Sequence, residues 1–269
     1  MAAAGDNACS GFSEADLALI DEAAGRFVAA HGLFTRALNR IGRTAGGAIA
    51  RVLTAFAPNT RAAIEDYASE ALWSMLGASR IGLAREREAS PARERLYRGA
   101  VVASGAASGF VGGMASLADI PFSMAMMFRA IAEIARSHGE DLDDFATRRA
   151  CLEVFGFGTV RDGDTEASYW AVRGALTHAP VSLFLRTVAA RFSVVISDQA
   201  LSSMVPVVGA LAGAGVNYLF MNHFQSMAQV HFTLRDLERR YGDAGAVRAC
   251  FDRHVEKHRQ RRHLFGNAA

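Results

Sequence analysis

The chain has 269 residues, of which 51% are apolar, and its 29 basic and 27 acidic side chains leave a formal net charge of +2. This composition excludes an intrinsically disordered chain, because the apolar residues are numerous enough to build a large core. A charge this close to zero also argues against a nucleic-acid partner. Proline occurs only five times and alanine is abundant, which favours helices over a β-sandwich. The predicted fold is all-α, a single multi-helix bundle of about ten helices.

Two short ends flank the expected domain. We place a flexible N-terminus at residues 1–12, one all-α domain at residues 13–263 and a tail at residues 264–269. The first residues lack a basic segment followed by an apolar one, and acidic side chains come early, at Asp6 and Glu14. This pattern argues against a signal peptide and favours a cytoplasmic location.

The cysteines are few and widely spaced. Cys9, Cys151 and Cys250 are odd in number and lie far apart in the chain. We therefore expect neither a disulfide framework nor a Cys-x-x-Cys site for a metal or for redox chemistry. A reducing cytosol is the compartment that fits this expectation.

The N-terminal part predicts two helices with different surfaces. Ser13 and Asp16 have the spacing of a capping box, and a helix is expected over residues 13–30. A second helix is expected over residues 33–56, with apolar side chains along one face. The opposite face carries Arg36, Arg40, Arg43 and Arg51. No acidic residue interrupts this stretch, so we predict that these arginines bind an anionic membrane surface.

Two later segments are unusually apolar. Residues 99–118 contain no Asp, Glu, Lys or Arg, and neither do residues 199–234. In both, glycine recurs every fourth residue, a spacing that lets two helix backbones approach closely. These glycines are Gly105, Gly109, Gly113, Gly209 and Gly213. We predict two glycine-rich apolar helical hairpins packed as in a glycine zipper. Both segments are also long enough to span a bilayer, so the sequence leaves open whether residues 99–128 and 199–222 insert.

Five further helices are expected in the C-terminal half, two of them near Ser168 and over residues 181–192. Asp143 or Asp144 is placed to cap the first of them. A long helix is expected over residues 218–241, ended by Gly242, and a last, basic helix over residues 244–263. No segment shows convincing strand alternation, which supports the all-α prediction.

Polar side chains on the apolar helices form a candidate binding site. His223 and His231 lie on apolar flanks of their expected helix, where a buried imidazole needs a hydrogen-bond partner. The candidate polar pocket consists of Asp119, Arg129, Asn217, His223, Gln225, His231 and Arg235. We expect Asp119 to be the acid that pairs with His231. A structural interpretation stays open, in which both histidines are core residues satisfied by their neighbours.

Signatures of common enzymes and cofactors are absent from the sequence. It has no glycine-rich dinucleotide or phosphate loop, no Gly-x-Ser-x-Gly elbow and no His-Glu-x-x-His zinc motif. His254 and His258 lie one helical turn apart, which suits two zinc ligands, but the sequence shows no third ligand. We expect a solvated basic helix there, and predict no cofactor, no metal and no catalytic residue.

Polar residues set in apolar surroundings give the chain a resemblance to a known family. The resemblance is carried by Leu117 to Pro121, Arg129 to Arg136, Gly139 to Asp141, Pro206 to Gly209, Gly213, Asn217, His223 to Gln225, Ala228, His231, Phe232, Arg235, Leu237, Glu238, Tyr241 and Gly242. Over residues 95–250 the chain is similar to the EcsC protein family. That family takes its name from a protein encoded beside an ABC transporter, and the resemblance implies little about biochemical activity.

Three functions are consistent with these features. The first is a non-enzymatic cytoplasmic protein that associates peripherally or reversibly with anionic membranes, as an accessory to a transporter or secretion system. The second is a hydrolase acting on a lipid or peptide through Asp119, Arg129, His223 and His231. The third is a soluble protein–protein interaction module. We favour the first, with an anionic membrane surface or a membrane protein as partner, and the sequence leaves the oligomeric state open.

Overall fold

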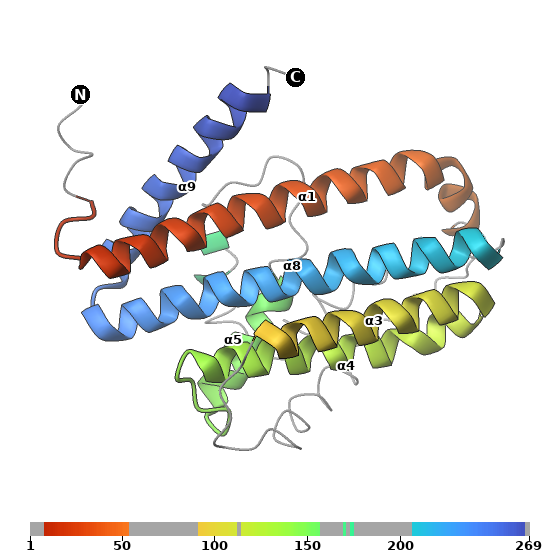
Figure 1. Cartoon of the computed structure of the whole chain (residues 1–269), viewed down its shortest axis with the longest axis horizontal. Helices are drawn as coiled ribbons and strands as arrows, with labels where there is room; N and C mark the ends of the chain where they lie inside the picture. Colours follow the sequence, from red (N-terminus) through yellow and green to blue (C-terminus); the bar gives the residue numbers. More distant parts are fainter. Residues whose placement is uncertain are drawn as a thin grey trace.

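The protein is described by a computed structural model that covers residues 8–53, 91–111, 114–156, 169–170, 173–174 and 206–266. Within these ranges the chain is helical and has no strand, so the all-α prediction is confirmed (Figure 1). The helices are α1 (Glu14–Leu53), α3 (Pro91–Val111), α4 (Met114–Ser137), α5 (Phe145–Gly156), α8 (Pro206–Tyr241) and α9 (Ala244–Gly266). These are six helices with bounds in the described ranges, where about ten were expected.

One reason for the lower number is that α1 is a single helix of 40 residues. It begins as predicted: the Asp16 amide donates to Ser13 Oγ at 3.2 Å, and the Ser13 hydroxyl donates to the Asp16 carboxylate at 2.6 Å. The predicted break near Gly32 is wrong. A glycine costs a helix interior only about 1 kcal/mol, and the neighbouring His31 ring packs against Phe27 and His223, which holds the backbone helical there.

Helix α8 is the central helix of the described part. In Figure 1 it lies between α1 on one side and the α3–α4 pair on the other. Side chains from several of its faces are fully buried, among them Met221, Phe224, Met227 and Val230. The uncharged stretch of α8 at residues 220–234 is therefore mostly protein core. No helix in the described residues combines the length and the apolarity needed to cross a membrane.

Helices α3 and α8 cross with their backbones in close approach. A Cβ atom built on Gly105 would lie 2.6 Å from the carbonyl oxygen of Gly213, and one built on Gly213 would collide with the Gly105 carbonyl. Glycine is needed at both positions because any side chain would meet backbone. The two expected glycine-rich hairpins are not shown, since α8 runs unbroken from Pro206 to Tyr241, and Gly113 lies outside the described residues.

Two of the next three helix ends are set by residues that the sequence predicted, Asp144 and Gly242. Asp144 begins α5, where its carboxylate accepts from the Ala146 amide at 3.2 Å. Gly242 ends α8 with a φ of +68°, a conformation that favours glycine. Asp243 then caps α9 by accepting from the Ala246 amide at 2.9 Å. These local signals placed the start of α5, the end of α8 and the start of α9, but α8 begins at Pro206 and not at residue 218 as expected.

A disulfide joins the two ends of the chain, against the expectation from the cysteine count. Cys9 lies in the turn before α1 and bonds Cys250 of α9, which is 241 residues away in sequence. The third cysteine, Cys151, is free and buried. Since disulfides are typical of oxidising compartments, the cysteines give no support to a cytoplasmic location, which stays a prediction. The expected domain boundaries at residues 12 and 263 also stay predictions.

Candidate functional site

The structure distributes the candidate polar pocket along α8 instead of gathering it. Asn217, His223, Gln225, His231 and Arg235 all belong to α8. From the first to the last of them the helix rises by about 27 Å at 1.5 Å per residue. The other two candidates, Asp119 and Arg129, lie on α4. The candidates fall into separate clusters, which they form with the helices that surround α8.

The first cluster ties α8 to α3 and α4 near the glycine crossing. The Asn217 amide donates to the Asp119 carboxylate at 2.8 Å and to the Val101 carbonyl at 2.9 Å. The hydroxyls of Ser104 and Ser123 donate to the same carboxylate. Asp119 is only 6% exposed, so its hydrogen bonds replace the water that it has lost. Both residues belong to the predicted polar pocket, but the sequence did not indicate that Asn217 is the partner of Asp119.

The second cluster lies about two turns further along α8. Arg98 of α3 donates to the side-chain oxygen of Gln225 at 2.8 Å, and the Gln225 amide donates to the Glu94 carbonyl at 2.9 Å. Arg129 of α4 donates to the Tyr97 hydroxyl at 3.2 Å. These bonds hold α3 against α8 and α4, so the two candidates Gln225 and Arg129 act as ties between helices.

His223 faces the opposite side of the bundle. Its ring lies 5.7 Å from the His31 ring of α1, centre to centre, and 5.5 Å from Phe224. His223 is 1% exposed. The prediction that it occupies an apolar flank is confirmed, and its environment is a ring cluster between α1 and α8.

His231 pairs with a different acid from the one expected. Its Nδ1 atom lies 3.1 Å from the Tyr169 hydroxyl, and its Nε2 atom lies 3.6 Å from the Glu153 carboxylate. Asp119 is bonded to Asn217, which is about 21 Å away along α8. The predicted pairing of Asp119 with His231 is therefore wrong, because the two residues meet α8 at positions four turns apart.

Burial sets the protonation of this pair. It raises the pKa of Glu153 to about 7, although the charges of Arg173 and Arg235 act against the shift. Burial also lowers the pKa of His231 well below 6.5, and the same two arginines add to that effect. Between the lowered pKa of His231 and about pH 7, a neutral carboxyl group beside a neutral imidazole is thus the stable form.

The last candidate, Arg235, belongs to an ion-pair cluster at the C-terminal end of α4. Its guanidinium donates to both carboxylate oxygens of Glu140, at 2.9 and 3.2 Å. Thr147 donates to the same carboxylate at 2.9 Å, and Arg239 also pairs with it. Burial alone would raise the pKa of Glu140, but the hydrogen bond and charge of Arg235 bring it below its usual value. The cluster fixes the loop after α4 against α8.

The chemistry available to these clusters is limited by burial. Tyr169, His231 and Glu153 form a row that could pass a proton among themselves, and none of them is more than 5% exposed. The site residues predicted from the sequence did not include Glu140, Glu153 or Tyr169. Glu153 carried a usable signal, because a single acid within the apolar stretch at residues 150–157 indicates a buried partner.

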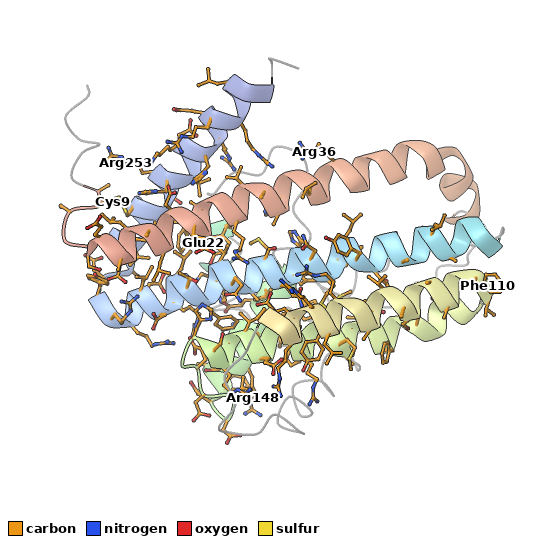
Figure 2. All side chains as sticks on the ribbon, viewed as in Figure 1. Cys9, Glu22, Arg36, Phe110, Arg148 and Arg253 are labelled. Carbon is orange, nitrogen blue, oxygen red and sulfur yellow. A yellow bond between two sulfur atoms is a disulfide. The ribbon has the colours of Figure 1, made fainter. Side chains whose placement is uncertain are left out.

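The predicted membrane-binding arginines are described only in part. Arg36 is exposed, and Figure 2 shows it on the side of α1 that faces away from α8. The side chains of Arg40, Arg43 and Arg51 lie outside the described residues, although the α1 backbone continues past all three.

Together these features define an all-helical protein built around one long central helix, which buried polar clusters tie to its neighbours. A family model described as the EcsC protein family matches residues 55–237. The chain belongs to the EcsC protein family, as its sequence resemblance predicted. Neither the curated proteins nor the solved structures compared with the chain gave a match.

Proposed function

We propose that this protein is non-enzymatic and binds anionic membrane surfaces peripherally and reversibly, through one end of its helical bundle. The observation that carries the proposal is a group of large apolar side chains left exposed at that end. Phe110, Val111 and Leu211 are 58%, 75% and 73% exposed. In an accessory role, this contact would hold the protein beside a transporter or secretion system in the membrane.

The three side chains come from the C-terminal end of α3 and the N-terminal end of α8, which lie at the same end of the bundle. Phe110 and Val111 form the C-terminal end of α3, and Leu211 lies in the second turn of α8. The close approach of Gly105 to Gly213 puts these parts of α3 and α8 side by side. Figure 2 shows Phe110 at the tip of the bundle, where α8 begins. We refer to Phe110, Val111 and Leu211 as the apolar tip.

A basic helix runs toward the apolar tip. The C-terminal half of α1 extends to the same end of the bundle (Figure 1) and carries four arginines without an acidic residue. Each basic residue near an anionic surface contributes about 1 kcal/mol, which salt screens. Apolar anchors beside basic side chains are typical of proteins that bind reversibly at a membrane surface.

The hydrolase alternative receives less support. It needs Asp119, Arg129, His223 and His231 to converge on one substrate. Instead, Asp119 is bonded to Asn217, Arg129 to Tyr97, and His231 to Tyr169, in clusters spread along α8. The arrangement suits ties between helices.

Vesicle flotation tests the proposal. The wild-type protein is expected to float with vesicles that contain phosphatidylglycerol at low salt, and to stay behind with phosphatidylcholine alone. A Phe110→Asp/Leu211→Asp variant removes two apolar anchors, so its bound fraction should fall at least tenfold. The matched control is Leu96→Asp, which changes a side chain that is 68% exposed at the other end of α3.

The contribution of the α1 arginines to membrane binding is tested separately. An Arg36→Glu/Arg40→Glu/Arg43→Glu variant should bind anionic vesicles weakly and show little further loss when salt is added. Unchanged flotation of both folded variants would show that the apolar tip and α1 are not the membrane contact. The third function, a protein–protein interaction module, would then be the better account.

A further inference from the structure

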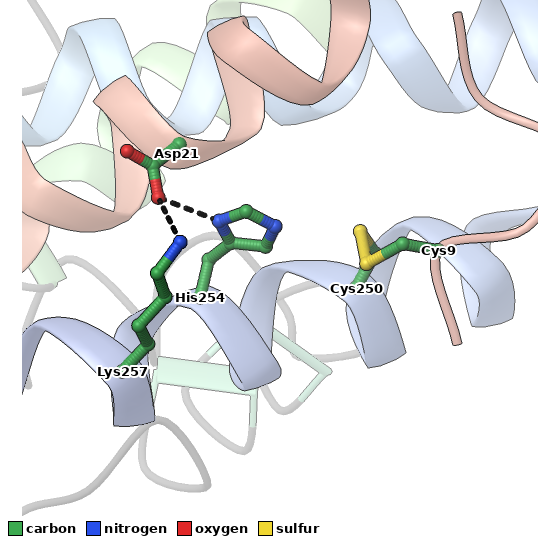
Figure 3. The surroundings of a disulfide bond; sticks show 5 residues. All are labelled: Cys9, Asp21, Cys250, His254 and Lys257. Atoms are coloured by element: carbon green, nitrogen blue, oxygen red, sulfur yellow. Dashed lines mark hydrogen bonds and ion pairs between the residues drawn. A yellow bond between two sulfur atoms is a disulfide. The ribbon is translucent and has the colours of Figure 1, made fainter. Parts of the chain in front are cut away.

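Three side chains with metal-binding atoms meet where the N-terminal turn contacts α9. The ligand atoms of Cys9, Cys250 and His254 all lie within 4.8 Å of one another. Cys250 and His254 are one helical turn apart on α9, and Cys9 reaches them from the turn before α1. Figure 3 shows the His254 ring between the disulfide and Asp21.

The hydrogen bond of His254 leaves one ring nitrogen for a ligand. Its Nδ1 atom lies 2.7 Å from the Asp21 carboxylate. Its other nitrogen, Nε2, is on the side of the ring that faces the two sulfurs (Figure 3). Metal-binding histidines typically have this arrangement, in which a carboxylate fixes the ring while the second nitrogen binds the ion.

The residue types favour zinc over other common ions. Two thiolates and one imidazole are soft and borderline ligands, which suit Zn²⁺ and suit Mg²⁺ or Ca²⁺ poorly. Three protein ligands would leave the fourth tetrahedral position for water or another ligand. The two sulfurs would have to separate to about 3.8 Å, the spacing of thiolates on a tetrahedral zinc ion.

We propose that Cys9, Cys250 and His254 form a redox-controlled zinc site, closed in the oxidised protein by the Cys9–Cys250 disulfide. In the first step two molecules of a thiol reductant break the S–S bond, giving two cysteine thiols and the disulfide of the reductant. In the second step Zn²⁺ binds both sulfurs and His254 Nε2, and the two thiols release two protons. The N-terminal turn is thus linked to α9 in both states, by the S–S bond in the oxidised protein and by the zinc ion in the reduced protein.

This site is separate from the apolar tip and from the clusters along α8. Cys9 and Cys250 both lie outside the segment that matches the EcsC family model, residues 55–237. The remaining cysteine does not compete for the ion, because Cys151 is fully buried on α5 and burial raises the pKa of its thiol.

Zinc titration of the full chain in both redox states tests the proposal. Protein reduced with a phosphine should bind one equivalent of Zn²⁺, measured against a chromophoric chelator, and the disulfide form should bind none. Co²⁺ added to the reduced protein should give the intense sulfur-to-metal absorption of two thiolate ligands. Asp21→Asn should weaken Zn²⁺ binding 10- to 100-fold through the loss of the carboxylate that orients His254.

Variants of two neighbouring histidines provide the matched comparison. His254→Asn and Cys9→Ser should each weaken Zn²⁺ binding at least 100-fold. His258→Asn should change Zn²⁺ binding less than threefold, because His258 is not part of the cluster. It is a matched control, since His258 contacts Asp21, at 3.2 Å, and so does His254. The proposal is overturned if the reduced protein binds no zinc, or if it binds equally well after His254→Asn and Cys9→Ser in variants that keep their helical circular dichroism.

Discussion

Replacing Gly213 by alanine is expected to lower the free energy of unfolding by about 2 to 3 kcal/mol. The added methyl group would collide with the carbonyl oxygen of Gly105, and it would lie 3.6 Å from the Gly109 Cα atom. Backbone atoms cannot rotate away as a flexible side chain can, so α3 and α8 would have to move apart. That movement would also strain the hydrogen bonds of Asn217, one turn further along α8.

Gly215→Ala is the control for this prediction. Gly215 lies on the same helix two residues later, and a Cβ atom there would meet nothing within 4 Å. This variant should gain about 0.5 to 1 kcal/mol, because alanine favours a helix more than glycine does. Thermal or urea unfolding of both variants measures the difference. Equal stability of the two would contradict the close helix crossing.

Replacing Glu153 by glutamine is expected to stabilise the protein more as the pH rises. Below about pH 4.5 the wild-type carboxyl group is protonated in both the folded and unfolded states, so its ionisation does not affect the free energy of unfolding. The raised folded pKa, about 7, means that the contribution of Glu153 to stability falls between pH 4.5 and 7. Above pH 7 the folded protein holds a buried carboxylate, which costs about 3 kcal/mol. Glu153→Gln removes that cost.

The measurement is the difference in free energy of unfolding between Glu153→Gln and wild type at pH 5 and at pH 8. His231 is present in both proteins, and its lowered pKa makes both less stable as the pH falls below 6.5. Glu140→Gln should behave oppositely, because the pKa of Glu140 is lowered: its loss of stability should be largest at neutral pH and shrink in acid. A difference for Glu153→Gln that does not change with pH would mean that Glu153 is charged throughout, paired with a protonated His231.

The parts of the fold that sequence analysis predicted correctly depend on residues close together in the chain. Ser13, Asp144 and Gly242 mark helix ends through hydrogen bonds and backbone conformations that span a few residues. The same holds for the helical periodicity that put His223 and His231 on apolar faces, where the structure buries them. Local signals of this kind do not require knowledge of which helices become neighbours.

The parts of the fold that were predicted wrongly depend on which helices pack against one another. Asp119 was expected beside His231, but the packing of α4 on α8 places it beside Asn217, and α5 supplies Glu153 instead. The disulfide between Cys9 and Cys250 arises because α1 packs on α9, which spacing in the sequence does not reveal. His31 continues α1 through contacts with another helix, and this overrides the local tendency of Gly32 to end it.

The most direct test of the membrane proposal is to observe the apolar tip while the protein binds. A polarity-sensitive fluorophore is attached to a cysteine introduced by Leu211→Cys, and, as the reference, to one introduced by Leu96→Cys. On phosphatidylglycerol vesicles the label at position 211 should brighten, shift to the blue and be quenched by lipids that carry a quencher in their acyl chains, and high salt should reverse these changes. The label at position 96 should not respond. No response at position 211, or equal responses at both positions, would contradict membrane binding through the apolar tip.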